Sequence, residues 1–259
     1  MCAAAGHPRR DPRFAPRHGL PLPLNLAIFR AVIFAAALGG LVAGVFLTGI
    51  QVFKVLPLIS QAEVFETAAG HKDHSHDEGS QAGHDESTTA VPSLQFERLG
   101  LTLFANVLTG IAFALMLTAG LALKAGKDVR EGYLWGLAGF ATFSLAPALG
   151  LPPELPGSQY ADLEARQIWW AATALATAVG IGLMVWAPKL ALKVLGAIII
   201  AAPHAAGAPH PESFEAGNLP AELAAAFVSA TLVANLLFWL VIGGVSAHAH
   251  KRLAPNPAQ

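Results

Sequence analysis

Apolar residues along this chain gather into blocks of roughly 20, the length of helix that crosses the ~30 Å hydrocarbon core of a bilayer. The pattern predicts an all-α integral membrane protein. We expect about six transmembrane helices, at residues 27–51, 101–123, 133–149, 168–187, 190–206 and 223–245. The fifth is the weakest candidate, because its apolar centre is short and Pro203 near its end favours a kinked or re-entrant segment.

The charged residues support six spans over five. With the amino terminus inside, the inner side has twelve Lys and Arg residues and three Asp and Glu residues. The outer side has four Lys and Arg residues and fourteen Asp and Glu residues. Basic residues in short loops mark the cytoplasmic side, whereas a five-span chain would place the basic carboxyl end outside. The predicted location is therefore a bacterial inner membrane, with both termini cytoplasmic.

The remaining composition divides the chain into one membrane domain and two tails. Residues 1–24, rich in proline and arginine, are expected to be a disordered basic tail. The membrane domain then covers 25–252, and a short tail covers 253–259. Cys2 is the single cysteine, which excludes an intrachain disulfide and a thiolate metal cage.

A hydrophilic loop at about 67–93, between the first two predicted spans, carries the clearest candidate chemistry. Imidazole and carboxylate groups are ligands for borderline divalent cations, and a segment this polar is expected to be flexible and to bind them in rapid exchange. On the predicted topology the loop is periplasmic; the alternative is a solvated loop without a ligand. The candidate metal ligands are His71, Asp73, His74, His76, Asp77, Glu78, His84, Asp85 and Glu86.

Polar residues near the ends of the spans are candidates for a transport pathway, because ionisable groups are scarce within the spans themselves. The alternatives are snorkelling to the interface and hydrogen bonding between helices. Glu154 lies in a Pro/Gly-rich stretch, 144–157, which is otherwise interpreted as a rigid cap over the helix ends. The candidates are Gln51, Lys54, Glu63, Asn106, Ser144, Glu154, Arg166, Gln167, His204 and Asn235.

Small residues four apart predict three packing seams, at Gly40 with Gly44, at Gly132 with Gly136, and at Ala174, Ala178 and Gly182. The five tryptophans lie mostly near predicted span ends, and we interpret them as interfacial anchors. They are Trp135, Trp169, Trp170, Trp186 and Trp239.

Several enzyme signatures are missing from the sequence. It has no phosphate-binding G-x-x-x-x-G-K-[ST], no nucleophile elbow, no H-E-x-x-H and no dinucleotide fingerprint. We expect neither an enzyme nor a tightly bound cofactor, and no nucleic-acid partner.

A longer set of motifs lies at residues 55–59, 62–63, 97–98, 132–140, 145–157, 161–163, 166–170, 203–204 and 207–209. Together these motifs resemble the CbtA family of predicted cobalt transporter proteins of bacterial inner membranes. The resemblance covers about 29–252. It implies a multi-span subunit for cobalt uptake, with Ni²⁺ or Zn²⁺ as alternative cargo, acting with a small single-span His-bearing partner (CbtB-like).

The function predicted from these observations is uptake of a divalent transition metal. The external loop would capture the ion, and Glu63, Glu154, Arg166, Gln167 and His204 would line the route inward. The alternative is a non-transporting protein that binds or senses the metal. The lipid bilayer is the expected environment, and assembly as a homo-oligomer is left open.

Overall fold

The computed structural model describes residues 26–70, 92–123, 128–211 and 219–254, and within them every regular element is helical. The tail predicted at 1–24 and all nine candidate metal ligands lie outside the described residues. The elements are α1 (Leu26–Ile50), η2 (Gln51–Val55), α2 (Leu56–Gly70), α3 (Pro92–Leu123), α4 (Val129–Phe140), η3 (Ala141–Leu145), α5 (Ala146–Ala148), α6 (Leu163–Trp186), α7 (Leu190–Ala206) and α8 (Ala221–Leu253).

Four helical segments are long and apolar enough to cross a membrane: Leu26–Phe65, Phe96–Leu123, Leu163–Trp186 and Ala221–Leu253. They correspond to four of the six predicted spans. The other two are present as helices, but α7 has 17 residues, and the helix from α4 to α5 is interrupted by η3. The all-helical membrane fold is confirmed, whereas the count of six spans stays a prediction.

Two helices extend beyond the predicted spans. The first continues past Gln51 through the π-helical segment η2 and α2 to Gly70. Proline at position 57 has no N–H to donate to the carbonyl four residues earlier, and its ring crowds that carbonyl. The wider π-helical turn of η2, just before Pro57, leaves room for the ring. The second helix begins at Pro92, nine residues before the predicted start at Leu101.

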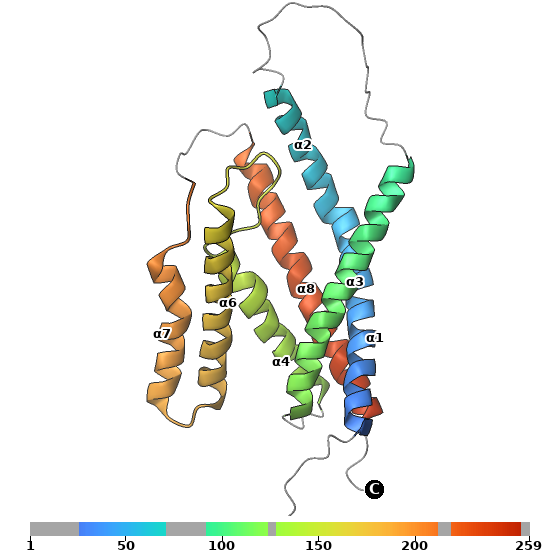
Figure 1. The fold of residues 1–259 in the computed structure, drawn as a ribbon, viewed down its shortest axis with the longest axis vertical. Helices are drawn as coiled ribbons and strands as arrows, with labels where there is room; N and C mark the ends of the chain where they lie inside the picture. Colours follow the sequence, from blue (N-terminus) through green and yellow to red (C-terminus); the bar gives the residue numbers. More distant parts are fainter. Residues whose placement is uncertain (1–25, 71–91, 124–127, 212–218, 255–259) are drawn as a thin grey trace, which may run out of the picture.

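Successive helices run in alternating directions between two ends of the molecule (Figure 1). One end of the molecule holds the carboxyl ends of α3, α6 and α8. It also holds the amino ends of α1, α4 and α7. Described basic residues at this end are Arg130, Lys189, Lys193, Lys251 and Arg252. The opposite end carries an excess of acids: Glu97, Glu154, Asp162, Glu164 and Glu222. We call these the basic end and the acidic end.

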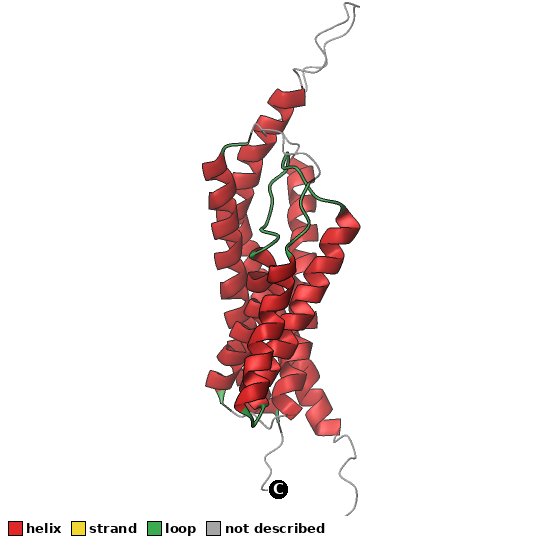
Figure 2. Ribbon diagram, turned by 90° about the vertical axis from the view of Figure 1, so that its left-hand side faces the viewer, coloured by secondary structure: helices red, strands yellow, loops and turns green. Residues whose placement is uncertain are grey.

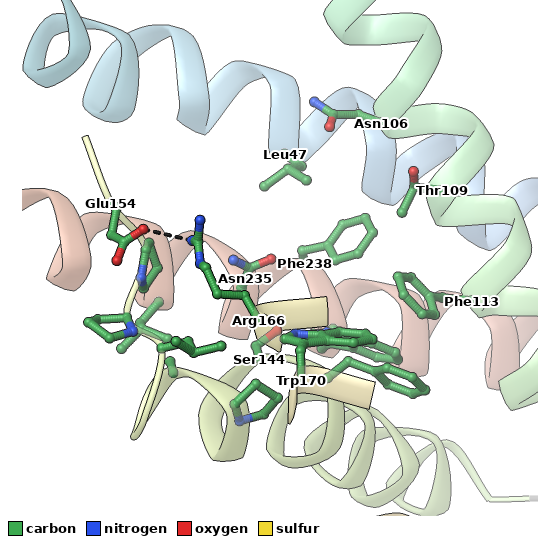
Figure 3. A pocket seen from close by; sticks show the side chains of 18 of the residues that line it. Leu47, Asn106, Thr109, Phe113, Ser144, Glu154, Arg166, Trp170, Asn235 and Phe238 are labelled. Carbon is green, nitrogen blue, oxygen red and sulfur yellow. Dashed lines mark hydrogen bonds and ion pairs between the residues drawn. The ribbon is translucent and has the colours of Figure 1, made fainter. Parts of the chain in front are cut away.

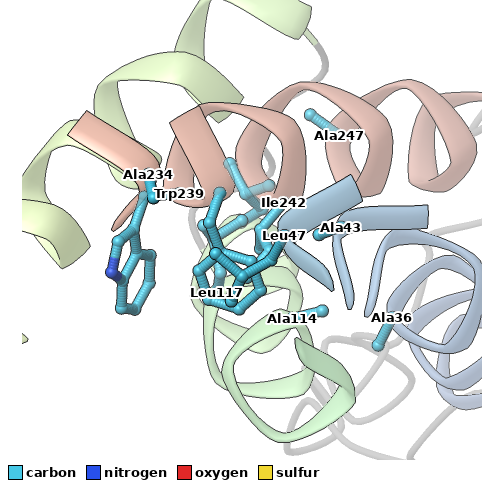
Figure 4. Packing of buried hydrophobic residues seen from close by; sticks show 11 residues of the cluster. Ala36, Ala43, Leu47, Ala114, Leu117, Ala234, Trp239, Ile242 and Ala247 are labelled. Carbon is cyan, nitrogen blue, oxygen red and sulfur yellow. The ribbon is translucent and has the colours of Figure 1, made fainter. Parts of the chain in front are cut away.

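Helices α1, α3, α4 and α8 form the packed part of the molecule, which we call the four-helix core. Its buried side chains include Leu47, Leu117, Trp239 and Ile242 (Figure 4). A Cβ added to Gly40 would overlap the backbone of α3 at Ile111. Helices without side chains at the contact can approach this closely, and the close approach supplies much of the van der Waals attraction between membrane helices.

The predicted small-residue seams are partly correct. Gly40 and Gly44 pack on α3, and Gly132 with Gly136 pack on α8, as expected. On α6, however, the contact with α7 is made at Gly180, which faces Gly196. Gly182 has only Trp186 of its own helix within reach, so the seam does not follow the predicted face.

Helices α6 and α7 pack mainly on each other, and α6 reaches the four-helix core through η3 and α5. In the side view, the connecting loops at the acidic end lie between the helices rather than above them (Figure 2). The space between the α6–α7 pair and the core is where the cavities described below occur.

Candidate functional site

A large cavity with several polar lining residues lies at the junction of the two parts and has a volume of about 640 Å³. Residues from α1, η2, α3, η3, α5, α6 and α8 and from the loop at 151–154 line it (Figure 3). Its polar lining residues are Gln51, Asn106, Thr109, Ser144, Glu154, Arg166, Gln167 and Asn235. Of the pathway candidates chosen from sequence, the fold therefore brings seven to one place. Their role in transport stays a prediction.

Neutral amides form one wall of this cavity. The Asn106 side-chain amide on α3 donates to Thr48 Oγ1 at 2.9 Å and to Gln51 Oε1 at 2.6 Å, which ties α3 to α1 and η2. The Asn235 amide instead donates to the Thr231 carbonyl of its own helix at 3.0 Å. Asn106 is thus a bridge between helices, one of the two interpretations open from sequence, and it also faces the cavity.

An ion pair lies at the acidic end of the cavity. Arg166 Nη2 donates to Glu154 Oε2 at 2.7 Å, and the two side chains are 26% and 23% exposed. The Arg166 guanidinium also lies 5.1 Å from the centre of the Tyr160 ring, within the range of a cation–π contact. Arg166 is therefore held from two sides.

The loop that carries Glu154 is fixed in place by its neighbours. Leu155 is 1% exposed and packs with Val55, Ala62 and Leu223. The Tyr160 hydroxyl donates to the Leu155 carbonyl at 2.8 Å. Asp162 then caps α6 by accepting from the amide of Ala165 at 2.9 Å. The stretch is a rigid cap, as one interpretation expected, and it also aims Glu154 at the cavity.

Burial raises the pKa of Glu154 above its ordinary value of 4.5, and the neighbouring Arg166 offsets only part of this rise. Desolvation disfavours the charged form of a carboxyl group, while an adjacent cation favours it. The carboxylate of Glu154 is therefore an energetically costly charge. A second cation arriving beside it would be attracted strongly, because Coulomb energy scales with the charge of the ion.

Aromatic side chains close the cavity toward the basic end. Phe143 and Trp239 stack at 5.7 Å between ring centres, and Phe113 lies 4.7 Å from Trp239. Trp239 is 1% exposed. Its assignment as an interfacial anchor is wrong, because Gly139 of α4 leaves a space in the core that its indole fills. Sequence reasoning misassigned Trp239 and missed Phe113 and Phe143, since the stack of Phe143 on Trp239 joins segments about a hundred residues apart.

A second, smaller cavity of about 430 Å³ adjoins the ion pair. Glu154 and Arg166 line both cavities, so the ion pair stands between them. The smaller cavity also has Pro209 and His210 in its lining. His210 is exposed at the acidic end of the molecule. The two cavities therefore adjoin each other at the ion pair.

Three pathway candidates do not line the large cavity. Lys54 is exposed on η2, and Glu63 is exposed on α2. His204 lies on α7 beside Trp169, with 5.7 Å between ring centres, and its buried Nε2 has no hydrogen-bond partner. Trp169 Nε1 donates to the Pro203 carbonyl at 3.3 Å, which holds α6 and α7 together. The surroundings of His204 belong to the α6–α7 contact.

No group of three or more His, Cys, Asp and Glu side chains that could hold a metal ion occurs within the described residues. Direct coordination by several protein ligands is the usual way to retain a borderline dication. The polar lining of the large cavity consists of amide and hydroxyl groups, one carboxylate and one guanidinium.

Comparison with known proteins gives one match. A family model described as "Probable cobalt transporter subunit (CbtA)" matches residues 29–251 of the 259. No curated protein matches the chain. The search of solved structures found no match either. The matched range covers all the helices of the described fold except the first three residues of α1 and the last two of α8.

Proposed function

The chain belongs to the probable cobalt transporter subunit (CbtA) family, and we propose that it is the membrane subunit through which a divalent transition metal, cobalt first, is taken up. A protein of this kind performs transport rather than catalysis, and its metal ion is cargo. The observation that carries the proposal is the large cavity, where eight polar residues from separate elements meet between helices of membrane-spanning length.

In this proposal the acidic end faces the periplasm and gathers cations. Carboxylates concentrated on one face raise the local concentration of approaching cations. The His71–Glu86 segment would capture the ion, because its imidazole and carboxylate groups are ligands that suit borderline divalent cations. The described acids at this end, from Glu97 to Glu222, support the same direction of attraction.

The ion pair would be the first contact inside the protein. A dication competes for the Glu154 carboxylate with twice the charge of the Arg166 guanidinium. Displaced from Glu154, Arg166 still has the Tyr160 ring, 5.1 Å away, as a partner. The metal would then meet Gln51, Asn106 and Gln167, which can hydrogen-bond to its water shell through amide oxygens.

We further propose an inner-membrane location with both termini cytoplasmic and a small single-span His-bearing protein as partner. The excess of Lys and Arg at the basic end supports that orientation. Six crossings would follow if α7 and the helix from α4 to α5 also span, since α1 and α8 reach the basic end with their amino and carboxyl ends respectively.

Flux of cobalt into proteoliposomes, measured with and without a co-reconstituted single-span partner, tests the proposal. We expect saturable uptake that is lost when His71, His74, His76 and His84 are changed to alanine at limiting metal. The matched control changes His248 to alanine, an exposed histidine near the basic end. Cobalt binding without any flux, with or without the partner, would favour the alternative of a metal sensor.

A further inference from the structure

A third cavity, of about 440 Å³, lies toward the basic end between α3, α4, η3 and α6. Its lining is mostly apolar, with Met116, Trp135, Ile181 and Trp186 among its residues. Glu131, near the start of α4, is in the lining and has one buried carboxylate oxygen without a hydrogen-bond partner. We call this cavity the inner cavity. We call the cavity of about 640 Å³ described above the outer cavity.

The outer and inner cavities share two lining residues, Phe143 and Trp239. The two rings are stacked, with their planes 8° apart. Phe113 braces the stack from α3, at 5.1 Å from Phe143 and 4.7 Å from Trp239. This layer of aromatic side chains therefore borders the outer cavity, toward the acidic end, and the inner cavity, toward the basic end.

Three consecutive residues of η3 face the two sides of this layer. Thr142 lines the inner cavity, Ser144 lines the outer cavity, and Phe143 between them lines both. Glu131 is twelve residues before Phe143, or about 18 Å at the rise of an α-helix. Trp239 lies near the middle of α8. The layer therefore falls within the membrane-spanning depth.

We propose that Phe143 and Trp239 are the gate of the metal path, closed in this structure, and that it opens when η3 moves relative to α8. This rests on the proposed function. A hydrated dication does not cross an apolar constriction that water has left. Separating the two rings would join the outer cavity to the inner one, and the ion would leave past Glu131 toward the basic end.

The surroundings of η3 suit such a movement. A π-helical turn has fewer well-aligned hydrogen bonds than the α-helix around it and often marks a functional site. Pro147 removes one further helical hydrogen bond next to it. η3 and α5 also carry the contacts between α6 and the four-helix core, so a shift of the α6–α7 pair would pull on Phe143 while Trp239 stays in the core.

Cysteine accessibility tests this gate without needing metal flux. With Cys2, the single cysteine, changed to serine, Ser144→Cys and Thr142→Cys are each introduced into the full chain. A membrane-impermeant thiol reagent is then applied to vesicles from one side at a time. We expect Ser144→Cys to react from the acidic side and Thr142→Cys from the basic side.

Opening the gate should abolish this sidedness. With Phe143→Ala added, we expect each cysteine to react from the opposite side at least about tenfold faster, since the apolar barrier is then breached. Phe143→Leu, which keeps an apolar side chain of similar reach, should preserve the sidedness and serves as the control. A melting curve in detergent for each variant excludes unfolding as the cause.

The outcomes separate the gate from the proposed cargo. If both cysteines react from the same side, or if Phe143→Ala leaves the rates unchanged, the gate is overturned even when cobalt flux is present. If the expected labelling occurs but no variant or partner combination carries cobalt, the cargo assigned to this chain is wrong while the partition between the cavities stands.

Discussion

The four-helix core and the α6–α7 pair are held together in different ways. Within the core, Gly40 meets the backbone of α3 and Gly132 meets the backbone of α8 at Gly243. Between the pair and the core, the contacts run mainly through one π-helical turn and one turn of helix. The cavities lie at this second junction. The comparison suggests a fixed scaffold beside a movable pair, with the polar residues placed where movement costs least.

Filling a glycine contact in the core should give the largest effect on stability. Gly40→Ala places a methyl group into the α3 backbone, and overpacking of this kind costs about 3 kcal/mol. We expect a large fall in melting temperature in detergent. Gly49→Ala is the matched control on the same helix, because nothing lies within 4 Å of a Cβ there.

The control should gain a few tenths of a kcal/mol from the higher helix propensity of alanine. If both substitutions leave the melting temperature unchanged, the close approach of α1 and α3 does not stabilise the protein, and the contrast between scaffold and movable pair loses its basis.

Replacing Glu154 should affect transport far more than stability. This outcome would contrast the junction between the α6–α7 pair and the core with the glycine contacts inside the core. Glu154→Gln keeps the shape of the side chain and removes the charge. A charge-assisted contact contributes about 1.5–3 kcal/mol, so cobalt uptake at limiting metal should fall roughly tenfold or more. A partly exposed ion pair contributes at most about 1 kcal/mol to folding, so the melting temperature should change little.

Glu164→Gln is the control for this test, because Glu164 also lies at the acidic end but lines neither the outer cavity nor the smaller one beside the ion pair. Equal losses of uptake in the two variants would indicate a general effect of surface charge, and would remove Glu154 from the pathway.

Asn106 should contribute to both stability and the cavity, at a smaller scale. Asn106→Leu breaks two hydrogen bonds from α3 to Thr48 and Gln51, and hydrogen bonds between membrane helices average about 0.6 kcal/mol each. We expect a loss of about 1 kcal/mol in thermal unfolding. Asn235→Leu, whose lost bond lies within α8, should cost less; a reversed order would show that Asn106 does not tie the helices together.

The hydropathy pattern predicted the helical fold and four of its long segments, because crossing a bilayer imposes a length that a single sequence reveals. It failed where packing between distant segments decides. The first predicted span stopped at Gln51, yet the helix continues through η2 and α2, where Val55 and Ala62 pack with Leu223 and Phe227. That contact joins residues more than 150 positions apart.

The candidate site was predictable in its parts and not in its arrangement. Polar residues within apolar spans are rare enough to be noticed individually, which identified Asn106, Arg166 and Asn235. The aromatic layer was missed because Phe143 looks like any other apolar residue of a span, and Trp239 was interpreted as an interfacial anchor. Only the space left by Gly139 on the facing helix gives Trp239 its position.

The pH dependence of uptake should be the smallest effect, and it distinguishes Glu154 from an exposed acid. Burial raises the pKa of Glu154 above 4.5, so its protonation begins at a higher external pH, and cobalt uptake should fall as pH drops through that raised pKa. Stability should move the other way. The unfolded chain releases this proton first, so the contribution of Glu154 to stability is lost as pH rises from 4.5 through the folded pKa. Glu154→Gln should weaken the dependence of both uptake and stability on pH, and the change in uptake should be at most a factor of a few. A wild-type uptake profile that the substitution leaves unchanged would mean that the titrating group lies elsewhere, and that the ion pair at the junction of the two regions is structural.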